Sequence, residues 1–164
     1  MDKSKIIKDI KIPEEVISLL STLQKNGYQA YLVGGCIRHI IMKKTPKDWD
    51  ITTNAKPDEI QAVFSDSFYE NDFGTVGVKT ESVDIVEITP YRQENGYTDG
   101  RHPDNVEYTN DINKDLARRD FTVNAIAYDC INDDLIDPYD GIADIDRKII
   151  KCVGDASIRF SEDG

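Results

Sequence analysis

Residues 30–53 read AYLVGGCIRHIIMKKTPKDWDITT, and this stretch decides the fold class. A short apolar run at 30–33 ends at two glycines and predicts a buried strand. Residues 36–42 place three isoleucines on one helical face, and Thr45-Pro46 closes that helix. Residues 49–53 are rich in β-branched side chains, which predicts a second strand. The unit is therefore strand, glycine turn, helix, strand.

The flanking segments extend this unit into a mixed α/β chain. Apolar spacing predicts a helix over 13–27, and a Pro-Asp-Glu start predicts another over 56–64. Two further strands are expected at 73–79 and 83–89. Residues 93–111 are polar and glycine-containing and are expected to form a mobile loop. A helix is expected over 111–119, and a last ordered segment around 149–153. Together the segments predict one mixed sheet in an α+β fold.

Length and composition set limits on the class of protein. The 164 residues suit one domain, and 39% hydrophobic with 31% charged residues is a globular balance. No apolar run is long enough to cross a bilayer and the start lacks a signal-peptide core, so we expect a soluble cytoplasmic protein. Three scattered cysteines suggest buried apolar residues instead of disulfides or zinc. The net charge of −11 argues against a nucleic-acid surface on this domain.

The triplet Asp48-Trp49-Asp50 is the strongest candidate for a catalytic site. On a strand, residues i and i+2 share a face with Cα atoms about 6.6 Å apart. Two carboxylates so placed can hold a pair of divalent metals for an in-line phosphoryl displacement, and Mg²⁺ suits oxygen ligands of this kind. Taken alone, the triplet is more often an ordinary solvated start of a strand.

A glycine pair lies upstream, where the first strand meets its helix. Glycines there let the backbone approach a phosphate, and Arg38 adds a cation that can bind it. An isolated Gly-Gly is more often a turn, so this element gains weight only beside the carboxylates. No P-loop pattern occurs, which disfavours a hydrolytic nucleotide motor.

Four strings carry a resemblance to a known family. They are residues 32–60, Val86 to Arg92, Arg101-His102-Pro103, and the run Asp115 to Ala125 with its Arg-Arg-Asp-Phe-Thr core. In this order and spacing they resemble the catalytic head of class II tRNA nucleotidyltransferases, the CCA-adding enzymes, and of bacterial poly(A) polymerases. An antibiotic-modifying nucleotidyltransferase would not be expected to carry the last string.

The resemblance implies a fold and a set of site residues. It implies the nucleotidyltransferase (DNA polymerase β-like) fold, with a mixed sheet of about five strands and helices mainly on one side. It implies Mg²⁺ on Asp48 and Asp50, with Glu87 as a third catalytic carboxylate and Asp84 as the second choice for that role. Nucleotide contacts are implied at Gly34, Gly35, Arg38, Arg119 and Asp163.

Two features leave alternatives open. The family usually has Asp after the first arginine, whereas this chain has His39, which changes how Arg38 is held. Arg92, Arg101 and His102 lie in or beside the polar segment, where they either influence nucleotide choice or only keep a surface loop soluble. The resemblance assigns a nucleotide contact to Arg119, whereas helical spacing predicts that Asp115 pairs with Arg118 or Arg119. Both hold if they concern different arginines.

The resemblance also implies a domain division and a reaction. Residues 1–153 would form the catalytic head, and 154–164 would start a neck that is truncated before the arginines that pair with the base. The neck, body and tail would make most of the tRNA contacts. The expected reaction is CMP and AMP addition from CTP and ATP to the 3′ end of tRNA. Poly(A) polymerase activity and a catalytically idle nucleotide-binding domain are the alternatives.

Overall fold

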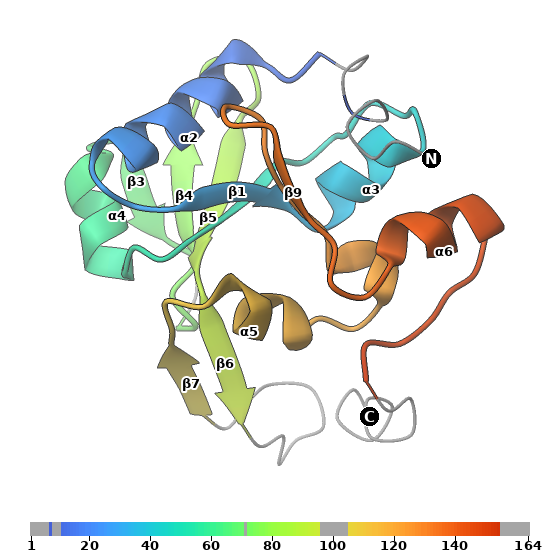
Figure 1. The fold of residues 1–164 in the computed structure, drawn as a ribbon. Helices are drawn as coiled ribbons and strands as arrows, with labels where there is room; N and C mark the ends of the chain where they lie inside the picture. Colours follow the sequence, from blue (N-terminus) through green and yellow to red (C-terminus); the bar gives the residue numbers. More distant parts are fainter. Residues whose placement is uncertain (1–6, 8–10, 71, 96–104, 155–164) are drawn as a thin grey trace.

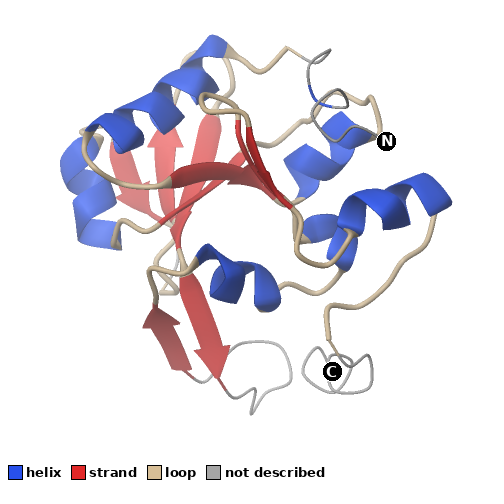
Figure 2. Ribbon diagram, viewed as in Figure 1, coloured by secondary structure: helices blue, strands red, loops and turns tan. Residues whose placement is uncertain are grey.

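The computed structural model describes residues 7, 11–70, 72–95 and 105–154, and its centre is one sheet of seven strands (Figures 1 and 2). The strand order is β3-β4-β5-β2-β1-β8-β9. These strands are β1 (Ala30–Val33), β2 (Asp50–Thr53), β3 (Ser67–Tyr69), β4 (Val76–Lys79), β5 (Ile85–Pro90), β8 (Ala127–Asp129) and β9 (Asp134–Ile136). Strands β6 (Arg92–Asn95) and β7 (Asn105–Tyr108) form a separate antiparallel pair.

The sheet is mixed because β2 and β5 pair in parallel while all its other described pairs are antiparallel. Their register sets Asp50 beside Glu87 and Ile51 beside Ile88. Side chains alternate across a strand, so these two rows lie on opposite faces. One face of the central strands is therefore apolar and the other carries the carboxylates.

Helices cover the apolar face and build the main core. This core takes side chains from α2 (Glu14–Lys25), α3 (Gly35–Ile41), α4 (Pro57–Val63) and α6 (Gly141–Arg147). In α2 the buried residues fall at helical spacing: Val16, Leu19, Leu20 and Leu23. A second, smaller core forms around α5 (Ile112–Ala117), through Ile112 and Leu116. Helices thus lie mainly on one side, as expected.

The fold class is confirmed, but the expected number of strands was too low. Three of the seven strands, β3, β8 and β9, have only three residues each, too few for a recognisable alternation. The prediction of a continuous loop over residues 93–111 was also wrong, because β6 and β7 lie in its first and second halves. The β6–β7 pair lies outside the main sheet, so most of its residues are polar, and the sequence lacks the alternation of apolar and polar residues that predicts a strand.

Other expectations hold in part. None of the helices in the described ranges is long and apolar enough to cross a membrane. The three cysteines are free thiols, but only Cys36 is buried, while Cys130 and Cys152 are partly exposed. The reading of all three as buried apolar residues was therefore wrong for two of them.

Candidate active site

An acidic pocket of about 360 Å³ opens on the polar face of the sheet, at the start of β2. Asp50 is the first residue of β2, and Asp48 lies just before that strand in a bend, so the pair is not wholly on a strand as expected. The pocket is lined by the carboxylates Asp48, Asp50, Glu70, Asp84 and Glu87, together with Lys47, Trp49, Val83 and Ile85. Both residues considered for the third carboxylate, Glu87 and Asp84, thus reach the same pocket.

Glu87 and Asp50 form the centre of this acidic cluster. Their strands set them side by side, and a protonated Glu87 can donate a hydrogen bond to the Asp50 carboxylate. Burial, a hydrogen bond with Glu70 and the charge of Asp50 raise the pKa of Glu87 to about 7. Burial also raises the pKa of Asp50, against the opposing charge of Arg119. Crowded carboxylates of this kind are stabilised by a cation.

The donor set fits a divalent cation of the magnesium type, because Mg²⁺ prefers oxygen ligands and binds through one or two carboxylates plus substrate phosphates. Asp48 and Asp50 would hold it, with Glu87 next to Asp50. Over residues 7, 11–70, 72–95 and 105–154, no three Asp, Glu, His or Cys side chains already converge on one point. The chain therefore offers the ligand chemistry, and a nucleotide's phosphates would complete the coordination.

A cationic side chain lies near these carboxylates. Arg119 follows α5, and its side chain is 16% exposed. Its charge limits the rise in the pKa of Asp50 that burial causes. Gly34 adopts φ 76° and ψ −139°, a conformation open only to glycine. A Cβ on Gly34 would lie 3.6 Å from an Arg119 guanidinium nitrogen. The glycine turn and Arg119 therefore lie against each other, next to the acidic pocket.

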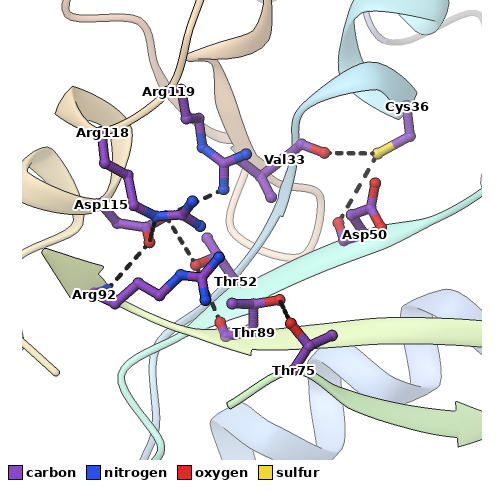
Figure 3. Close-up of polar contacts among 10 residues, drawn as sticks. All are labelled: Val33, Cys36, Asp50, Thr52, Thr75, Thr89, Arg92, Asp115, Arg118 and Arg119. Atoms are coloured by element: carbon purple, nitrogen blue, oxygen red, sulfur yellow. Dashed lines mark hydrogen bonds and ion pairs between the residues drawn. The ribbon is translucent and has the colours of Figure 1, made fainter. Parts of the chain in front are cut away.

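Asp115 binds the two arginines that follow it along the chain (Figure 3). Its carboxylate accepts hydrogen bonds from Arg118 Nε at 3.1 Å and from Arg119 Nη2 at 3.2 Å. It also accepts from the Thr52 hydroxyl at 3.1 Å and from the Arg92 backbone N–H at 3.2 Å. Burial alone would raise the pKa of Asp115, but the two guanidinium groups outweigh it and hold that pKa below its ordinary value. The expected pairing with one arginine is therefore a pairing with both.

Arg38 has a different anchor. Its Nη1 donates to Asn124 Oδ1 at 2.6 Å, and Asn124 ends the short 3-10 helix η1 (Thr122–Asn124). A Cβ on Gly35 would lie 3.6 Å from Arg38 Nη2, so this guanidinium also flanks the glycine turn. An acceptor for Arg38 therefore exists although His39 stands where the family usually has Asp. We find no hydrogen bond of His39 to Arg38 within the described part of the chain.

Sequence reasoning missed three residues that the structure brings into the site. Asn124 lies in the run Asp115 to Ala125 that carries the resemblance, two residues after its Arg-Arg-Asp-Phe-Thr core, so the sequence did offer it as a candidate. Thr52 lies two residues after Asp50 on the same strand, so its side chain is on the same face of the sheet, and this spacing could have identified it. Glu70 gave no signal, because it follows a three-residue strand that was not expected.

The remaining predicted residues lie apart from the carboxylates or outside the described ranges. Arg92 begins β6, where its Nη1 donates to the Phe73 carbonyl at 2.9 Å and its guanidinium lies 5.7 Å from the centre of the Phe73 ring. Arg101, His102 and Asp163 fall outside the described residues.

Known proteins are similar to this chain over nearly its whole length. A CCA-adding enzyme of Staphylococcus aureus is 42% identical over 156 residues, which are 94% of this chain and 38% of that enzyme. One of Lactobacillus helveticus is 37% identical over 167 residues, covering 96% of this chain and 40% of that enzyme. The chain thus spans about two fifths of the length of these curated relatives.

Solved structures support the same relationship. The crystal structure of the Bacillus stearothermophilus CCA-adding enzyme in complex with CTP superposes with a TM-score of 0.82 at 35% identity. The match covers 94% of this chain and 37% of that one. The family model described as the poly A polymerase head domain matches residues 30–151, and it includes the glycine turn, the carboxylates and the Arg118-Arg119 pair. The resemblance read from the motifs is confirmed, and the chain belongs to the poly A polymerase head domain family, together with its CCA-adding relatives.

Proposed function

We propose that this chain is the catalytic part of an enzyme that adds CMP and AMP, from CTP and ATP, to the 3′ end of tRNA. Two similar proteins are named CCA-adding enzymes, and a structure that superposes with a TM-score of 0.82 is of a CCA-adding enzyme in complex with CTP. The enzyme would act in the cytoplasm. Most tRNA contacts would come from outside this acidic domain, whose net charge is −11.

One observation carries the proposal: two guanidinium groups flank the glycine turn, and the charge of one of them, Arg119, acts on Asp50 in the acidic pocket. Asp50 and Glu87 supply oxygen ligands, while Arg38 and Arg119 lie within contact of the positions a Cβ would occupy on Gly35 and Gly34. A nucleoside triphosphate with its metal needs both groups at once. A small acidic or purely basic ligand would need only one of them.

The residues divide the work of nucleotidyl transfer. The RNA 3′-hydroxyl gives up its proton to water and its oxygen bonds to the α-phosphorus. The bond from that phosphorus to the oxygen shared with the β-phosphate breaks, and pyrophosphate leaves with that oxygen. Arg38 and Arg119 would bind the triphosphate and offset its charge, and Arg119 acts strongly because it is largely removed from water. Gly34 would let the phosphates approach the backbone. Asp48 and Asp50 would hold Mg²⁺, which activates the attacking hydroxyl and stabilises the leaving oxygen when bound.

Incubation of the intact protein with tRNA lacking its terminus, followed by sequencing of the 3′ ends, tests this function. We expect CCA ends from CTP plus ATP, and no growth beyond the last A. An unstructured RNA of equal length serves as the control substrate. Long A tracts on that RNA would instead identify a poly(A) polymerase, the activity in the name of the matching family model. Nucleotide binding without incorporation on either RNA would identify an idle nucleotide-binding domain.

A further inference from the structure

The Asp115 carboxylate joins parts of the chain that carry the two halves of the site. It is fully buried, and its partners come from β2, from the start of β6 and from the end of α5. Thr52 lies two residues beyond Asp50 on the same face of β2. A single carboxylate therefore links the strand of Asp50 to the arginine that flanks the glycine turn.

Arg119 depends on this link for its position. An arginine side chain has several rotatable bonds, so its end is placed only by what it contacts. Within the described residues its guanidinium has one hydrogen-bond partner, Asp115, and its buried Nε has none. Figure 3 shows the Arg119 guanidinium between Asp115 and Val33, the residue that precedes Gly34.

We propose that Asp115 is a positioning residue for nucleotide binding, which rests on the proposed function of the site. Asp115 holds the Arg119 guanidinium against Gly34, where the triphosphate would bind, and it sets the spacing between that cation and Asp50 through Thr52. The ligand class is a nucleoside triphosphate, and Asp115 itself does not contact it. Loss of Asp115 leaves Arg119 present but misplaced.

A second buried aspartate provides a matched control. Asp144 in α6 is 2% exposed and accepts hydrogen bonds from the Thr122 hydroxyl and from Arg147, each at 2.6 Å. Each aspartate thus accepts hydrogen bonds from a threonine hydroxyl and from the arginine three residues after the aspartate. Arg147, however, is 59% exposed and is not near the acidic pocket's lining residues. Asp144 has the same chemistry as Asp115 but holds no arginine beside the glycine turn. Its only link to the site is indirect, because Thr122 starts η1 and Asn124, the anchor of Arg38, ends it.

The experiment compares Asp115→Asn, Thr52→Val and Asp144→Asn in the intact protein. For each variant, kcat and KM for CTP and for tRNA are measured, together with the melting temperature and CTP binding by calorimetry. Asp115→Asn is expected to raise KM for CTP at least about tenfold, because Arg119 is no longer held where the triphosphate would bind. A tenfold change corresponds to about 1.4 kcal/mol of binding free energy. KM for tRNA should not change. Thr52→Val should raise KM for CTP less, because it removes one of four hydrogen bonds to Asp115.

Asp144→Asn separates positioning from stability. It should lower the melting temperature as Asp115→Asn does, yet raise KM for CTP far less, because Arg119 keeps its partner and only the helix that carries Asn124 is weakened. Unchanged KM and calorimetric affinity for CTP in a folded Asp115→Asn protein would overturn the proposal. Should Asp115→Asn fail to fold, an unchanged KM in Thr52→Val overturns it instead. If the unaltered protein adds no nucleotide, the proposed function fails, while calorimetry still tests Asp115.

Discussion

The two halves of the site hold their charges in different ways. Asp50 and Glu87 are strand residues, and the backbone ladder between β2 and β5 fixes their spacing. Arg38 and Arg119 are long side chains at helix ends, and each needs a further residue, Asn124 or Asp115, to hold its guanidinium. The carboxylate half is therefore fixed by the fold, and the guanidinium half by side-chain contacts. Substitutions should accordingly affect the chemical step in the first half and nucleotide binding in the second.

The largest effect is expected from Asp50→Asn, which removes one charge from the carboxylate half without changing its shape. The incorporation rate, kcat, should fall by roughly 1,000-fold or more, about 4 kcal/mol of transition-state stabilisation, because a metal ligand is lost. The melting temperature should not fall, since burial already disfavours the charged form of Asp50. Single-turnover incorporation with saturating CTP measures this rate.

Asp84→Asn is the matched control for Asp50→Asn, because Asp84 lines the same pocket but precedes β5 and lacks the strand register with Asp50. It should retain most of the activity. A loss as large as that of Asp50→Asn would move the third catalytic carboxylate from Glu87 to Asp84.

A smaller effect is expected from Asn124→Ala, which removes the acceptor of Arg38 in the guanidinium half. KM for CTP and for ATP should rise by about tenfold, the usual result of losing a charge-assisted hydrogen bond worth about 1.5 kcal/mol. Initial-rate kinetics with each nucleotide measures the change. Asn132→Ala is the control, since Asn132 donates to Asp129 in a turn away from the acidic pocket. A fall in kcat with KM unchanged would mean that the two halves are not separable.

The smallest effect is a dependence of stability on pH in the carboxylate half. In the folded protein the pKa of Glu87 is raised from 4.5 to about 7, so the folded state binds a proton more tightly than the unfolded state does. Without divalent metal, the melting temperature should fall as pH rises from about 4.5 to 7, and Glu87→Gln should flatten this decrease. Calorimetric scans in EDTA measure it. An equally steep decrease in Glu87→Gln would assign the effect to other groups.

Sequence reasoning succeeded where local pattern decides the structure. The strand at 30–33 and the glycine turn were predicted at their observed positions, because an apolar run ending in two glycines is a local signal. Helix α2 was predicted within two residues at each end, because its buried side chains repeat at helical spacing. The motifs also predicted Asp50 and Arg119 as site residues.

What sequence could not give was the pairing of distant segments. The parallel register of β2 and β5 places Glu87 beside Asp50, and no local pattern encodes a register between strands so far apart. Glu70 joins the cluster only through the short strand β3. The two anchors of the arginines, Asn124 and Asp115, depend on how α5 and η1 pack against β2 and α3. Such contacts are decided by tertiary packing, not by local propensity.

The parallel pairing of β2 with β5 has a consequence for how this domain can vary. Everything between these strands, α4, β3 and β4, is an excursion that leaves the Asp50 strand and returns beside it. Insertions or deletions within the excursion would leave the Asp50–Glu87 neighbours in register, because the ladder itself sets that register. They would alter Glu70 and the rim of the pocket. Insertions and deletions are therefore expected to accumulate in the excursion. There they would change the residues around Asp50 and Glu87 without separating the two carboxylates.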